Sequence, residues 1–167
     1  KERNAESIFN AIGEELSKDG IELIPATTFL DDLLPLAGHV CGPKPAKRLS
    51  DDAAFGFKIA KEMSRLDIGQ TVIVKKGTVL AVEAFEGTNE AIKRGGNLGR
   101  GEVVVVKVSK PGQDLRFDVP CIGPDTIEIA AASSVSAIVV EAKKTLLLGK
   151  DQIEESADKN KVTVFAY

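Results

Sequence analysis

The sequence has 167 residues, of which 43% are hydrophobic and 28% are charged, and its formal net charge is −3. This length suits one domain, or one domain with an appended segment, and is enough to bury a sizeable core. The acidic balance, with seven Phe, one Tyr and no Trp, argues against the basic surface and stacking platforms of a nucleic-acid-binding protein.

The cysteines and the N-terminus bear on where the protein works. Cys41 and Cys121 are far apart and lack a CxxC spacing, so we expect two free thiols rather than a zinc site or a disulfide framework. Lys1 begins a charged, helix-like stretch rather than a signal peptide, and no apolar run is long enough to span a bilayer. We therefore expect a soluble, cytoplasmic protein. Since the chain lacks an initiator Met, it is interpreted as a fragment of a longer protein.

The first 49 residues are expected to be a helix followed by a linker. Apolar residues repeat at Ile8, Ile12 and Leu16, which predicts an amphipathic helix over residues 2–18. A short strand is expected at residues 21–24, and the prolines that follow make residues 25–49 linker-like. We expect residues 1–49 to be the remnant of a connection to a missing N-terminal domain. The apolar stripe of the helix must be covered, and a partner subunit across a dimer is the predicted cover.

Strands and helices alternate from about residue 50 onward, where residues 50–167 are predicted to form a single catalytic domain. The pattern favours an α/β or α+β fold with a mixed β-sheet and flanking helices. β-branched runs predict that residues 103–106 and 138–140 lie in buried central strands. In chain order we expect a helix at 50–66 capped by Ser50, a hairpin of strands 71–74 and 78–84, a helix at 89–94, a flexible glycine-rich stretch at 95–101, a strand at 102–108, a loop at 110–123, a helix at 124–133, strands at 137–140 and 145–148, a helix at 150–160 and a strand at 162–165.

The loop after the strand at 102–108 is the first candidate site. The segment KVSKPGQDLRFDVPCIGP leads from that strand into a turn at Pro111-Gly112. Its cations can offset phosphate charge, and its carboxylates can hold a divalent ion or orient water. A solvated loop with surface ion pairs is the alternative. The candidate residues of this loop are Lys110, Gln113, Asp114, Arg116 and Asp118.

Other candidates lie at the end of the second strand of the predicted hairpin and just after it. Glu83 and Glu86 are expected to add oxygen ligands for a divalent ion, although a strand end followed by a helix that Thr88 caps is the alternative. The glycines at 95–101 match no phosphate-loop motif. His39 is the only histidine and is expected to be an exposed loop residue, which argues against triad chemistry and histidine metal sites. The groups that remain for catalysis are carboxylates, Lys and Arg side chains, together with a hard metal ion.

Three segments resemble the C-terminal domain of the LpxI family. They are LDIGQTVIVKKGTVLAVEAFEGTNEAIKR (66–94), KPGQDLRFDVPCIGPDTIE (110–128) and VEAKKTLLL (140–148). The segment IELIPATTFLDDLLP (21–35) resembles the stretch that precedes that domain. The sequence departs from the usual family residues at Ser109, Cys121 and Lys143-Lys144, none of which is assigned to the chemistry.

The resemblance implies an enzyme of lipid A biosynthesis. Members of the family hydrolyse the pyrophosphate of UDP-2,3-diacylglucosamine to UMP and 2,3-diacylglucosamine 1-phosphate (lipid X), and they require a divalent cation, normally Mg²⁺. It also implies a homodimer, and peripheral contact with inner-membrane lipid is expected. The alternatives are a non-catalytic ligand-binding or dimerisation fragment and, more remotely, a nucleotide-sugar transferase.

Residue roles follow from the residue pattern and the resemblance together. An essential aspartate of the family maps by position to Asp114, with Asp118 as the second choice. Asp114, Glu83 and Glu86 are then the expected metal ligands. Substrate phosphate is expected to bind Lys110, Arg116 and Gln113.

Overall fold

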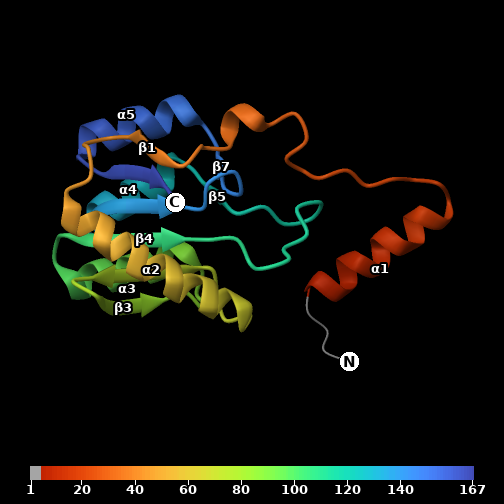
Figure 1. Cartoon of the computed structure of the whole chain (residues 1–167), viewed down its shortest axis with the longest axis horizontal. Coiled ribbons are helices and arrows are strands. Elements are labelled where there is room, and N and C mark those ends of the chain that lie inside the picture. Colours follow the sequence, from red (N-terminus) through yellow and green to blue (C-terminus); the bar gives the residue numbers. More distant parts are fainter. Residues whose placement is uncertain (1–4) are drawn as a thin grey trace.

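A mixed β-sheet of six strands, covered by helices on both faces, is the centre of the fold (Figure 1). The computed structural model describes residues 5–167. The strand order is β1-β8-β6-β4-β2-β3, in which β4, β6 and β8 run parallel and β2 is antiparallel to both of its neighbours. The strands are β1 (Gly38–Cys41), β2 (Thr71–Lys75), β3 (Thr78–Val82), β4 (Val103–Lys107), β6 (Val135–Val140) and β8 (Thr163–Ala166). The predicted α/β class with a mixed sheet is confirmed.

The centre of the sheet is built from the β-branched runs that the sequence singled out. Val103 to Val106 of β4 and Ile138 to Val140 of β6 are almost completely inaccessible to solvent. The two strands pair in parallel, with Val105 opposite Ile138. Burying each such side chain contributes about 1.5–3 kcal/mol relative to leaving it exposed. The prediction that these two strands are buried and central is confirmed.

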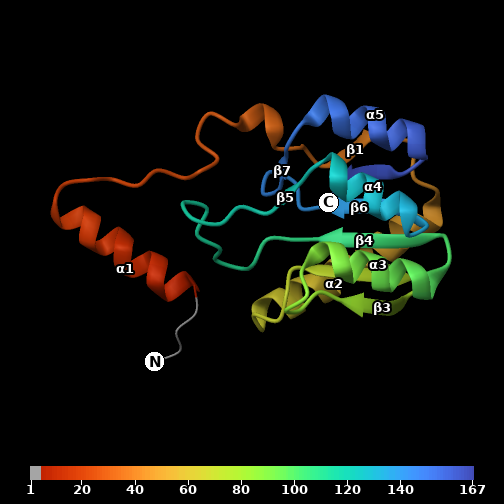
Figure 2. The same cartoon turned by 180° about the vertical axis from the view of Figure 1, so that it is seen from behind.

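Side chains alternate between the two faces along each strand, so the two faces bury different residues. Helix α2 (Lys47–Arg65) covers one face, where it packs on Val72, Val104 and Val106. The opposite face, which carries Ile73 and Val105, is covered by α3 (Thr88–Gly99), α4 (Pro124–Ala132) and α5 (Lys150–Asn160). The view from behind shows these three helices in front of the sheet (Figure 2). Within residues 5–167, no helix is both long enough and apolar enough to cross a membrane.

A second, smaller sheet was only partly predicted. It consists of β5 (Cys121–Ile122) and β7 (Leu146–Leu147), which pair in parallel. β5 lies in the segment expected to be a loop, and β7 is shorter than the strand expected at 145–148. Two residues are too few for a period-two pattern to show in the sequence.

The N-terminal segment departs most from the expectations. Helix α1 (Ala5–Lys18) agrees with the predicted helix, of which residues 2–4 lie outside the described part of the chain. Residues 21–24 do not form a strand, because no neighbouring strand supplies a hydrogen-bonded partner. The predicted linker contains the short 3-10 helix Asp31–Leu33 and the edge strand β1, which pairs with β8.

His39 and Cys41 lie on this edge strand, and Cys121 lies on β5 of the smaller sheet. His39 is exposed as expected, but it lies on β1, and its Nε2 is 2.9 Å from the carbonyl oxygen of Gly42. Within residues 5–167, Cys41 and Cys121 are both free thiols, as predicted. Cys41 is buried, and this burial raises the pKa of its thiol to about 11.

Helix α2 begins earlier than predicted. It starts at Lys47, with Ala46 at the N-cap position, so Ser50 lies inside the helix rather than capping it. Asp52 lies beyond the first turn of the helix and is buried. Its two carboxylate oxygens accept hydrogen bonds from the backbone N–H groups of Lys76 and Gly77, each with an N···O distance of 2.8 Å. Asp52 therefore ties α2 to the turn between β2 and β3.

The glycine-rich segment is a buried helix face and not a flexible stretch, so that prediction is wrong. Gly95, Gly96 and Gly99 all belong to α3 and are buried, and the helix ends at Arg100 in the left-handed conformation. A Cβ atom added to Gly96 would lie 2.2 Å from the carbonyl oxygen of Ser133. Glycine is required here because α3 approaches backbone at the end of α4 too closely for any side chain.

We expect Gly96→Ala to lower the free energy of unfolding by about 1–3 kcal/mol, since the added methyl group forces helix and backbone apart. Urea unfolding followed by circular dichroism measures the change. Asn97→Ala, on the exposed side of the same helix, is the matched control and should leave stability unchanged or slightly increased. A Gly96→Ala variant as stable as the Asn97→Ala control would contradict the packing argument.

Candidate active site

Charged side chains gather where the parallel strands of the sheet end. Glu83 follows β3, Lys107 ends β4, and Glu141 follows β6. In open α/β sheets, ligand sites lie at the carboxyl ends of the parallel strands. A pocket of about 300 Å³ opens at this edge, lined by Asp67, Ile68, Gly69, Gln70, Glu83, Ala84, Lys107 and Lys110.

The loop from Lys110 to Asp118 starts at this pocket and has a defined internal structure. Oε1 of Gln113 accepts hydrogen bonds from the Lys110 backbone N–H at 2.8 Å and from the Ser109 hydroxyl at 3.0 Å. Its Nε2 donates to Oδ2 of Asp118 at 2.6 Å. The Gln113 side chain thus joins the two ends of the loop. The ion pairs of Lys110 with Asp67 and of Arg116 with Asp114 are also what a solvated loop with surface ion pairs would contain, so that alternative stays open.

Asp114 and Arg116 form a bidentate ion pair at the outer part of this loop. Nε of Arg116 donates to Oδ1 of Asp114 at 2.9 Å, and Nη2 donates to Oδ2 at 2.6 Å. These bonds from Arg116 hold the pKa of the Asp114 carboxyl below its usual range. The same pairing raises the pKa of the Arg116 guanidinium. Asp114 and Arg116 therefore form a pair of opposite charges in this loop.

Helix α1 lies beyond this loop, apart from the body of the sheet, in both views of the chain (Figures 1 and 2). The ring of Phe9 stacks on the ring of Phe117 with 5.1 Å between centroids, and the N–H of Ala26 donates to the carbonyl oxygen of Leu115 at 2.8 Å. Ile8 and Ile12 of α1 nevertheless remain 53% and 46% exposed. The loop therefore lies between the pocket and a helix whose apolar stripe is largely open.

The carboxylates proposed as metal ligands are not gathered in one cluster. Glu83 lines the pocket, Asp114 pairs with Arg116, and Glu86 pairs with Arg94. Hydrogen bonds from the Glu86 backbone N–H and from Arg94 lower the pKa of Glu86. Within the part of the chain that the structure describes, no three Asp, Glu, His or Cys side chains are grouped to hold a metal ion. The metal roles of these residues stay predictions.

The pocket suits a metal cation that is bound mostly by substrate phosphate and water, with few bonds to the protein. One buried oxygen of Glu83, Oε2, has no hydrogen-bond partner among the described residues. Mg²⁺ typically keeps several waters and binds proteins through one or two carboxylates together with substrate phosphates. Glu83 alone can therefore contribute the protein side of such a site.

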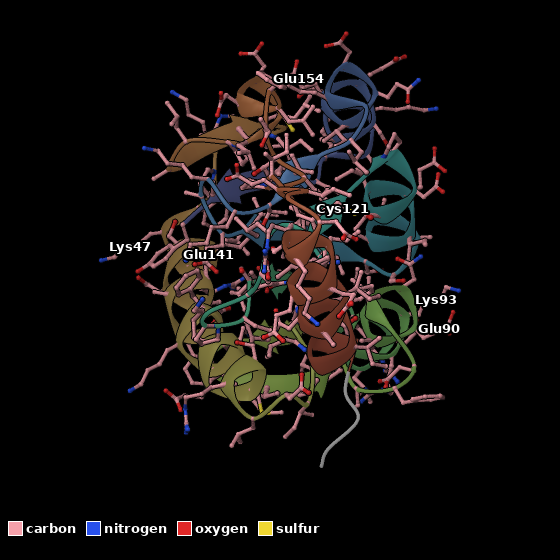
Figure 3. All side chains as sticks on the ribbon, turned by 90° about the vertical axis from the view of Figure 1, so that its right-hand side faces the viewer. Lys47, Glu90, Lys93, Cys121, Glu141 and Glu154 are labelled. Atoms are coloured by element: carbon pink, nitrogen blue, oxygen red, sulfur yellow. The ribbon has the colours of Figure 1, made fainter. Side chains whose placement is uncertain are left out.

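Sequence reasoning missed a second charged network, which anchors the start of the loop. Nζ of Lys61 donates to the Ser109 carbonyl oxygen at 2.7 Å and lies 3.0 Å from Oε2 of Glu141. The same Oε2 accepts the Ser109 N–H at 2.9 Å, and Lys144 pairs with Oε1 at 2.9 Å. Figure 3 labels Glu141 within the molecule on the side of α2. Its position directly after a buried strand is the sequence signal that could have revealed it.

Sequence reasoning also missed Lys107, although its position at the end of a buried strand is a similar signal. It ends the buried run of β4 and lines the pocket, where its Nζ donates to the Thr88 hydroxyl at 3.1 Å. A lysine that ends a buried strand lies at the edge where α/β domains bind ligands. Lys110, by contrast, was predicted as a site residue, and it lines the same pocket while pairing with Asp67.

These features define an α/β domain with lysines and carboxylates side by side at the carboxyl edge of a mixed sheet. That combination suits a ligand with both negative and positive charge, such as a metal-bound phosphate. The chain belongs to the LpxI family, because the family model described as the LpxI C-terminal domain matches residues 36–165. The predicted family resemblance is confirmed.

A curated relative supports the same assignment. The chain is 34% identical, over 161 residues, to a protein of Caulobacter vibrioides named UDP-2,3-diacylglucosamine pyrophosphatase LpxI. The aligned region covers 92% of this chain and 58% of that relative. The chain therefore spans less than two thirds of the length of the relative it matches.

Proposed function

We propose that this chain forms the C-terminal part of an enzyme of lipid A biosynthesis that hydrolyses UDP-2,3-diacylglucosamine to UMP and 2,3-diacylglucosamine 1-phosphate. The observation that carries the proposal is the 34% identity to a pyrophosphatase over 92% of the chain. The family match at residues 36–165 contains the whole of the pocket and of the Lys110–Asp118 loop. Phosphate chemistry is assigned to this edge of the sheet.

In the proposed reaction, the cationic side chains of the loop and pocket bind phosphate and the carboxylates orient water or metal. Lys110 and Arg116 offset the negative charge of the pyrophosphate through their own positive charges. Asp114, held ionised by Arg116, orients the attacking water or a metal-bound ligand. Gln113 keeps Asp118 close to the base of the loop through its amide. A bound Mg²⁺ would neutralise charge that develops on the phosphate oxygens.

A second candidate function is a ligand-binding or dimerisation fragment without activity of its own. The observation that favours it is the exposed apolar stripe of α1, with Ile8 and Ile12 about half exposed. We propose that a partner subunit of a homodimer covers this stripe. We also propose that the protein is cytoplasmic and contacts lipid of the inner membrane through its substrate.

The test is an assay of UMP release from UDP-2,3-diacylglucosamine by the full-length protein and by this chain, with MgCl₂ and with EDTA. We expect the full-length protein to release UMP with MgCl₂ and to stop when EDTA removes the metal. Substrate binding without turnover by this chain alone would favour the fragment function. A full-length protein that binds the substrate but never releases UMP would overturn the proposed reaction.

A further inference from the structure

Three polar side chains form a row across β3, β2 and β4 on the face that α3 covers. Thr71 is the register partner of Lys107, and the N–H of Glu83 donates to the carbonyl oxygen of Thr71 at 2.8 Å. Residues directly opposite each other in antiparallel strands project from the same face. Glu83, Thr71 and Lys107 therefore lie next to one another, with Thr88 of α3 over them.

The hydrogen bonds of this row are incomplete. The Thr88 hydroxyl donates to Oε1 of Glu83 at 2.7 Å and accepts from Nζ of Lys107 at 3.1 Å. Oε2 of Glu83 and Oγ1 of Thr71 are buried and have no partner in residues 5–167, and Thr71 is completely inaccessible. Buried polar atoms in native proteins nearly always have a partner, which is an ordered water or a bound group where protein provides none.

The charges in the pocket point to the kind of group that is missing. Lys107 forms no ion pair with the described part of the chain, whereas Lys110 is paired with Asp67. A free phosphate in the pocket would face the Glu83 carboxylate, and a lone cation would face the Lys107 ammonium. A phosphate that carries a divalent cation satisfies both, since the ammonium binds the phosphate oxygens and the carboxylate binds the cation.

We propose that the pocket bounded by Glu83, Lys107 and Lys110 binds a phosphate group together with a divalent cation. Lys107 donates to a phosphate oxygen, and Oε2 of Glu83 binds the cation or one of its waters. The volume of about 300 Å³ is at the small end for ligand pockets, which suits a phosphate and not an acyl chain. This deepens the proposed function by naming its phosphate subsite, and it gives Lys107 a role.

Calorimetric titration of this chain with inorganic pyrophosphate, with and without MgCl₂, tests the subsite. We expect MgCl₂ to tighten pyrophosphate binding, and we expect Lys107→Met to weaken it about tenfold, because a charge-assisted hydrogen bond is lost. Glu83→Gln should remove most of the effect of MgCl₂ and leave the weaker, metal-free binding. If Lys107→Met does not fold, Lys107→Gln keeps a donor for Thr88 and removes only the charge.

Lys93→Met and Glu90→Gln are the matched controls. These two residues of α3 pair with each other at 2.7 Å and are 49% and 59% exposed, and Figure 3 shows them at the outer surface of the helix. Neither variant should change pyrophosphate affinity. A folded charge-removing variant of Lys107 with wild-type affinity would overturn the phosphate assignment, and full Mg²⁺ dependence in Glu83→Gln would overturn the cation assignment.

Activity of the full-length protein separates this proposal from the proposed function. Mg²⁺-dependent pyrophosphate binding that Lys107→Met weakens, without hydrolysis of UDP-2,3-diacylglucosamine, would support the subsite and contradict the proposed reaction. Normal hydrolysis with unchanged kinetics in Lys107→Met would support the reaction and contradict the subsite.

Discussion

Replacing Asp114 with alanine in the full-length protein is expected to lower turnover of UDP-2,3-diacylglucosamine by roughly a thousandfold or more, as removal of a catalytic group does. Arg116 pairs with both oxygens of the Asp114 carboxylate, but each carboxylate oxygen can accept more than one hydrogen bond, so we expect Asp114 to orient water or a metal from this position. The described residues near it in the loop offer no histidine as an alternative base. Steady-state and single-turnover assays of UMP release measure the loss.

The fold and the binding of substrate should survive this change. The loop is held by hydrogen bonds and ring stacking of Gln113, Leu115 and Phe117. Among the described residues, the Asp114 side chain bonds only to the backbone N–H and the guanidinium of Arg116. Asp158→Ala, on the exposed side of α5, is a control that should not alter turnover. Near-normal turnover in Asp114→Ala would transfer the role to Asp118. If Asp118→Ala were also active, the carboxylate-loop mechanism would have to be abandoned.

The sequence predicted the core of the fold because its strongest signals are local. Four consecutive valines at 103–106 cannot form an amphipathic strand, so they indicate a strand buried on both faces. Strand β1 was missed because it is held by pairing with β8, more than a hundred residues further along the chain. No local pattern reports a partner at that separation, and prolines around it indicated a linker.

The glycines of α3 were misread for a related reason. Gly95 and Gly96 have low helix propensity, and propensity alone favours a loop. They nevertheless lie in a helix, where the close approach of α3 to Ile73 and to Ser133 leaves no room for a side chain. Tertiary packing therefore outweighs local preference at this point, and only the structure reveals it.

The site residues named from the sequence stay predictions, and the sequence did not show how they are arranged. The loop follows β4 and Glu83 follows β3, and the structure brings Lys110 and Glu83 to the lining of one pocket. The sequence could not show that Arg116 occupies the Asp114 carboxylate or that Arg94 occupies Glu86. It also gave no reason to join Lys61 with Glu141, which are 80 residues apart.

Glu141→Ala is expected to lower the free energy of unfolding by about 2–3 kcal/mol at pH 7, since removing one member of a buried ion pair leaves the other charge without compensation. Glu141 is 7% exposed, and its removal leaves the partly buried Lys61 ammonium without a counter-charge and the buried Ser109 N–H without its acceptor. Urea unfolding of the wild type and of the variant at pH 7 measures the difference.

The difference in unfolding free energy between the wild type and Glu141→Ala should become smaller as the pH falls. Burial alone raises the pKa of Glu141, but hydrogen bonds from Lys144, the Ser109 N–H and Lys61 outweigh it, so the pKa in the folded protein is below the usual range. A carboxyl with a lowered folded pKa stabilises the protein above its unfolded pKa of about 4.3 and loses that contribution as pH falls through the folded pKa. The stability gap between wild type and Glu141→Ala should therefore shrink below about pH 4.

Two further variants separate the charge of Glu141 from its shape. Glu141→Gln keeps an oxygen that accepts the Ser109 N–H but carries no charge, so its stability relative to the wild type should lie between those of the wild type and of Glu141→Ala at pH 7. Glu62→Ala removes an exposed partner of Arg65 on α2, where both side chains are 61% exposed, and should change stability by no more than about 0.5 kcal/mol. If Glu141→Ala were no less stable than Glu62→Ala, or if its deficit persisted unchanged in acid, the ion pair with Lys61 would not be what anchors the loop.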